Sequence, residues 1–163
     1  MLRQVESARA RGKARVLEDD LDEQARARPN DPMPRVYKAW LSFPEDSCWN
    51  ELKALSTLYP ENPWPHVGMG LIYVRWKMLA EARPAFAAAL KESPGFAPAL
   101  WGEAQLLQAE GKLPEAEARL REALSRLDEP QLRTSLGLLL ASLPGREAEA
   151  RAELTRAVEG WPE

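Results

Sequence analysis

Alanine recurs along this chain at a fixed interval of 34 residues, and that interval constrains the fold more than any other feature of the sequence. Two series follow the interval: Ala82, Ala116 and Ala150, and Ala89, Ala123 and Ala157. Between the two series, each copy carries a large apolar residue: Phe86, Leu120 or Leu154. A period of about 20 to 50 residues is typical of repeat arrays, in which each unit is too thin to bury its own apolar face and must stack on its neighbours.

The composition and the breaks within each repeat predict helices and no strands. Alanine, leucine, glutamate and arginine dominate and are strong helix formers, and prolines fall between the periodic segments, where they start or stop helices. No stretch alternates between apolar and polar residues as a half-buried strand requires. In the clearest copy, residues 62–92 predict a helix, a turn at residues 77–79 and a second helix, before Ser93-Pro94-Gly95 breaks the chain.

The pattern predicts one domain, residues 1–163, built as an all-α solenoid of stacked antiparallel helix pairs. Its approximate repeats are 1–29, 30–60, 61–95, 96–130 and 131–163. The first repeat is incomplete, because residues 2–10 are the remnant of a first helix. In the last repeat, Leu136-Gly137 and Leu140 fit the pattern of the earlier copies only if the following turn has one extra residue.

One copy carries a motif that suggests a family. Met69-Gly70, Tyr73, Ala82, Phe86, Ala89 and Pro94 follow the spacing L-G-x₂-Y, A-x₃-F, A and P. On these residues the chain resembles the tetratricopeptide repeat (TPR) family, over about five repeats. The resemblance implies a right-handed α-solenoid whose first helices line a concave groove. It also implies a scaffold or adaptor that binds other proteins and has no enzymatic activity.

The resemblance places one set of residues in this groove, on the first helix of each hairpin. They are Trp40, Trp64, Val67, Leu71, Arg75, Trp101, Gln105 and Gln108, followed in the last repeat by Leu138 and Ala141. Aromatic and aliphatic anchors with a few amide donors suit a peptide or an amphipathic helix of another protein. Two alternatives stay open: the tryptophans fill the core between repeats, or residues 2–21 fold into the groove.

A second hypothesis is structural. The open ends of the array and the six tryptophans favour a self-associating segment of a larger chain or oligomer. A molecular mass in solution that rises with concentration would separate self-association from peptide capture.

Some members of the family that the chain resembles have a carboxylate clamp, in which lysine, asparagine and arginine side chains hold the acidic C-terminus of a chaperone. The corresponding places in this chain are Val36, Trp40, Gly68, Pro98 and Gly102. None of these residues is a lysine, an asparagine or an arginine, so we do not expect such a clamp.

The single cysteine and the single histidine do not suggest catalysis. Cys48 lies 34 residues before Ala82, which predicts a small, buried packing residue. His66 stands where the family often has tryptophan, which predicts a packing role, and nothing in the repeat pattern brings it to Cys48. We expect no metal site and no cofactor, since the sequence also lacks a glycine-rich phosphate loop.

Charged residues are expected to stabilise helices along their solvated faces. The helix dipole stabilises acidic side chains near the start of a helix, and arginines can pair with those acids. The acids are Glu115, Glu117, Glu147 and Glu149, and the arginines are Arg119, Arg121, Arg126, Arg151 and Arg156.

The bulk composition excludes several classes of protein. The net charge of −3 disfavours binding to nucleic acid, and no apolar run of about 18 residues exists that could span a membrane. No signal peptide is visible at the N-terminus, so a full-length chain would be cytoplasmic. The abundance of arginine and alanine favours a bacterial origin.

Overall fold

The computed structural model describes residues 12, 14–42 and 47–160, and the regular elements of this part of the chain are all α-helices. They are α2 (Ala14–Ala27), α3 (Met33–Ser42), α4 (Ser47–Leu58), α5 (Pro63–Arg75), α6 (Leu79–Glu92), α7 (Ala97–Ala109), α8 (Leu113–Arg126), α9 (Pro130–Ala141) and α10 (Glu147–Glu159). The helix expected at residues 2–10 lies outside the described residues. None of the described helices is both long and apolar enough to cross a membrane.

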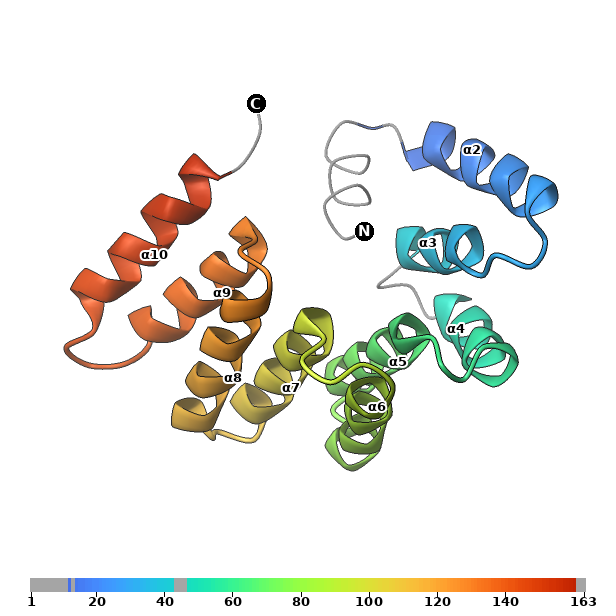
Figure 1. Ribbon diagram of the computed structural model, residues 1–163. Coiled ribbons are helices and arrows are strands. Elements are labelled where there is room, and N and C mark those ends of the chain that lie inside the picture. Colours follow the sequence, from blue (N-terminus) through green and yellow to red (C-terminus); the bar gives the residue numbers. More distant parts are fainter. Residues whose placement is uncertain (1–11, 13, 43–46, 161–163) are drawn as a thin grey trace.

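The helices pack in consecutive pairs and form a curved array (Figure 1). α3, α5, α7 and α9 lie on the inner side of the curve, and α2, α4, α6, α8 and α10 lie on its outer side. The predicted all-α array of stacked helix pairs is confirmed. A molecule bound inside the curve would therefore meet the odd-numbered helices.

Local sequence determines where these helices start. The side chain of Asn62 accepts a hydrogen bond of 3.0 Å from the backbone N–H of Trp64, and a proline follows it as the first residue of α5. Gly111 and Gly145 precede α8 and α10 with φ of 78° and 77°, a left-handed conformation that glycine adopts without strain. The equivalent place before α6 holds Lys77, with φ of 63°.

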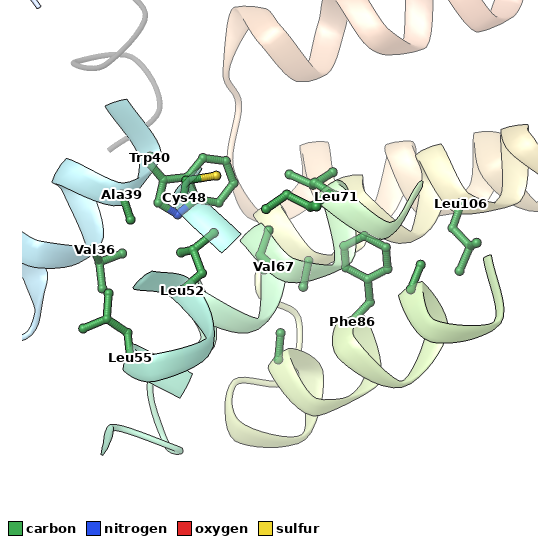
Figure 2. Packing of buried hydrophobic residues seen from close by; sticks show 14 residues of the cluster. Val36, Ala39, Trp40, Cys48, Leu52, Leu55, Val67, Leu71, Phe86 and Leu106 are labelled. Carbon is green, nitrogen blue, oxygen red and sulfur yellow. The ribbon is translucent and has the colours of Figure 1, made fainter. Parts of the chain in front are cut away.

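The core is built by large residues of the outer helices that insert between inner helices. Phe86 of α6 is 0% exposed, and its ring lies so close to Gly70 of α5 and Gly102 of α7 that a Cβ at either glycine would overlap it. Leu52 of α4 lies against Gly68 in the same way, one repeat earlier. Figure 2 shows Leu52 and Phe86 in this core. The recurring pattern of small, large and small residues thus sets the spacing of the array.

The last hairpin has the longer turn that its sequence required. Residues 142–146 separate α9 from α10, whereas residues 110–112 separate α7 from α8. Because of the longer turn, Gly137 lies against Leu154 as Gly70 lies against Phe86. The Leu136-Gly137 motif therefore occupies the expected place.

An ion pair joins α6 to the hairpin that follows it, and another joins α8 to the hairpin after that. The outer helix supplies the positive charge in the first pair and the negative charge in the second. Arg83 of α6 pairs with Glu110, which follows α7. Glu117 of α8 lies 34 residues after Arg83, and it pairs at 3.0 Å with Arg146, which precedes α10. Equivalent places in these two repeats thus carry opposite charges.

Candidate protein-binding groove

The structure divides the residues expected in the groove into a buried set and an accessible set. Trp40, Val67 and Leu71 are only 3%, 0% and 4% exposed, so they belong to the core beneath the inner surface. The other five are Trp64, Trp101, Gln105 and Gln108, which are half-buried, and Arg75, which is exposed. The alternative in which tryptophans fill the core therefore describes Trp40, while the half-buried residues keep part of their surface accessible.

Trp64 is the centre of an aromatic row. Its ring meets the rings of Trp40 and Phe96 edge-on, with centroids 6.1 Å and 5.0 Å away. Beside it lies a surface pocket of about 340 Å³, lined by Trp64, residues 93–98, Arg126, Leu127 and Glu129. Sequence reasoning missed Phe96 because it follows the Pro94-Gly95 break. Its position directly before an inner helix was the signal that could have found it.

Trp101 is held in place by a contact between inner helices. Its Nε1 donates a hydrogen bond of 2.9 Å to Oγ of Ser135, which lies 34 residues later on α9. The Ser135 hydroxyl in turn donates to the carbonyl oxygen of Gln131 at 3.0 Å. The indole N–H is therefore satisfied within the chain, and Trp101 can offer a ligand its apolar ring only.

Leu138 contributes apolar surface on α9. It is 61% exposed, and it follows Gly137 as Leu71 follows Gly70. Ala141, one turn further along, is also exposed. The inner side of the array thus offers apolar groups on α5, α7 and α9.

Two sequence interpretations need correction or restriction. The five positions that correspond to a carboxylate clamp are all buried and face the core, not the groove. They are Val36, Trp40, Gly68, Pro98 and Gly102. Their residue types therefore say nothing about the chemistry of the groove. Of the segment 2–21, residues 14–21 belong to α2 on the outer side, and residues 2–11 lie outside the described part of the chain.

The two residues that could suggest catalysis have structural environments. Cys48 is 2% exposed and belongs to the same core as Trp40 and Leu52, as its place in the repeat predicted (Figure 2). His66 contacts the loop before α5 instead, since its Nε2 lies 3.2 Å from the carbonyl oxygen of Pro60. In the part of the chain that the structure describes, no three His, Cys, Asp or Glu side chains gather to hold a metal ion.

The charged groups near α7 and α8 have opposite electrostatic environments. Burial raises the pKa of the Glu103 carboxyl. Nε of Arg119 lies 3.1 Å from Oε2 of Glu103 but is not aligned for a hydrogen bond. The positive charge of Arg119 therefore offsets the increase in pKa only in part. Hydrogen bonds from Arg146 and Arg121 lower the pKa of Glu117. The expected pairing of arginines with acids near helix starts is confirmed for Arg121, which also contacts Glu149.

Comparison with known proteins identifies the architecture. A family model of the tetratricopeptide repeat matches residues 77–139, from the turn before α6 into α9. The structure of a thermophilic TPR protein from Thermus thermophilus matches 99% of this chain and 90% of that protein, with a TM-score of 0.80 and 22% identity. Residues 77–139 match the tetratricopeptide repeat, and the chain has the fold of a TPR solenoid. Its helices correspond to about four to five TPR units.

Other TPR-like structures show the same fold at low identity. MamA from Desulfovibrio magneticus RS-1 matches 96% of this chain and 90% of its own, with a TM-score of 0.58 and 17% identity. A chain of the APC/C hetero-tetramer Cut9–Hcn1 matches 98% of this chain and 31% of its own, with a TM-score of 0.79 and 18% identity. Among curated proteins, none matches the sequence. TPR solenoids serve in general as scaffolds for protein–protein interaction rather than as enzymes.

Proposed function

We propose that this TPR solenoid is a scaffold or adaptor that captures a peptide or an amphipathic helix of another protein on its inner side. The observation that carries the proposal is the half-buried ring of Trp64, which, with Phe96, borders a pocket of about 340 Å³. An aromatic ring that its neighbours already hold loses little conformational entropy when a ligand covers it. Such rings are common binding anchors.

The accessible residues indicate the chemistry of the ligand. The ring of Trp101 and the side chain of Leu138 are apolar, while Gln105 and Gln108 on α7 offer amide groups. A helix with an apolar stripe and polar flanks matches this surface, because its anchors recur every three or four residues. Arg75 adds positive charge on α5, which favours acidic groups in the ligand.

Two leucines of equal exposure make a matched test. Leu138 on the inner helix α9 is 61% exposed, and Leu58 on the outer helix α4 is 60% exposed. Helical peptides selected by display on the parent chain should bind Leu138→Lys about tenfold more weakly than Leu58→Lys, as measured by fluorescence anisotropy. Selected peptides that lose affinity for Leu58→Lys instead would refute capture on the inner side.

Self-assembly is the competing hypothesis and makes a different prediction. In that case the mass measured by light scattering rises with concentration in the absence of any ligand. A partner captured from the source cell by the parent and by Leu58→Lys, but lost by Leu138→Lys, would instead identify the ligand and its pathway.

A further inference from the structure

α10 is the last described helix and lies at the end of the array (Figure 1). No further hairpin of the described residues covers its apolar end face, whereas the next hairpin covers the equivalent face of α6 and of α8. Phe86 and Leu120 are 0% and 1% exposed beneath α7 and α9, whereas Leu154 at the equivalent place is only half-buried. Val158, one turn later, is 73% exposed. These residues, with Ala141 and Ala150, line a surface pocket of about 540 Å³. Apart from Ala141, which we also placed in the inner groove, the residues that line this end face lie on α10.

One charge on this end face follows the pattern of the earlier repeats. Arg151 is the fifth residue of α10, as Arg83 is of α6 and Glu117 of α8. Arg83 and Glu117 each pair with an oppositely charged residue in the turn that follows the next inner helix. Arg151 is exposed and forms no salt bridge with any residue in the described ranges. It has the sign of Arg83, so the matching partner group is an acid.

We propose that this end face binds an α-helix of a partner protein that carries an apolar stripe and, directly after its last turn, an acidic residue. The apolar stripe covers Leu154 and Val158 as α9 covers Leu120. The acidic residue pairs with Arg151 as Glu110 pairs with Arg83. The partner thereby continues, across two chains, the stacking that holds the array together.

The same geometry gives the direction of the partner helix. Each inner helix starts beside the end of the outer helix before it, because a short loop joins them. A partner helix in this arrangement runs antiparallel to α10, with its first turn near Glu159 and its end near Arg151. The carboxylate of Glu159 then lies close to the positive end of the partner's helix dipole.

The chain itself supplies a probe for this surface. A synthetic peptide with the sequence of residues 96–112 contains α7 and Glu110, which together cover the equivalent groove of α6 in the folded chain. We expect it to bind the parent chain and to perturb the amide NMR signals of α9 and α10. Val158→Lys should weaken this binding about tenfold or more. Val16→Lys on α2 is the matched control, since Val16 is 69% exposed, and it should leave the affinity unchanged.

A charge exchange tests the proposed pair. Arg151→Glu should weaken binding of the peptide about two- to fivefold, which is the range for an exposed ion pair. A peptide in which lysine replaces Glu110 should bind Arg151→Glu better than it binds the parent. The proposal is overturned if the peptide does not bind, or if it binds Val158→Lys as well as the parent. It is also overturned if the peptide-free chain forms a dimer that Val158→Lys dissociates, since a second copy would then be the occupant.

Discussion

Glycines on the inner helices determine how far a neighbouring side chain can enter. Phe86 fits between α5 and α7 because Gly70 and Gly102 carry no Cβ at the points of contact. Gly102→Ala should lower the free energy of unfolding by about 1–2 kcal/mol, because overpacking against a rigid, buried ring outweighs the better helix propensity of alanine. Urea denaturation followed by circular dichroism measures the change.

The ring of Phe86 provides the control for this substitution. If overlap with the ring is the cause, Gly102→Ala should cost less in a Phe86→Leu background than in the parent, because leucine occupies less of the space near α7. Equal costs in the two backgrounds would contradict the packing explanation.

Two carboxyl groups should give opposite dependences of stability on pH. Burial raises the pKa of Glu103 in the folded state, so the charged form is disfavoured once the pH exceeds the unfolded pKa of about 4.3. Glu103→Gln should therefore stabilise the chain at pH 7, by less than about 1 kcal/mol, and the gain should vanish as the pH falls below that value. Denaturation at a series of pH values measures this.

Glu117 is the matched counterpart, since Arg146 lowers its pKa in the folded state. The stabilisation from its charged form is present above the unfolded pKa and is lost as the pH falls through the lower, folded pKa. Glu117→Gln should therefore destabilise the chain at pH 7, again by less than about 1 kcal/mol, and should be neutral at low pH. If both substitutions shift stability in the same direction at pH 7, the assigned environments are wrong.

Among the elements, the turns are the part that the sequence predicts best. Gly111 marks the turn before α8, and the spacing of Leu136-Gly137 required the longer turn that the structure has before α10. The sequence could not predict which residues of the groove are accessible. Val67 and Trp101 occupy equivalent places, yet one is fully buried and the other half-buried, because burial depends on side-chain size and on the neighbouring helices.

The turn before α6 carries a strained residue that a substitution can relieve. Lys77 adopts a positive φ at the place where Gly111 and Gly145 stand in later repeats. Lys77→Gly should stabilise the chain by about 0.5–1 kcal/mol, since relief of the left-handed strain exceeds the entropy that glycine adds to the unfolded chain. The urea midpoint should rise with an unchanged slope. A lower midpoint would show that the lysine side chain makes contacts worth more than the strain.

At the scale of the whole molecule, we expect each hairpin to have its own local stability rather than to unfold together with all the others. Each hairpin of a solenoid contacts only its neighbours, so a local loss acts mainly on the nearest units. Leu154→Ala removes the side chain that packs α10 against Gly137 of α9. Hydrogen exchange in α9 and α10 should therefore become about tenfold faster, while α5 and α6 change little. This change lies just below the range for truncation of a fully buried leucine, because Leu154 is half-buried. The exposed Leu138→Ala should leave exchange unchanged throughout. An equal acceleration from α3 to α10 would show instead that these helices unfold as one cooperative unit.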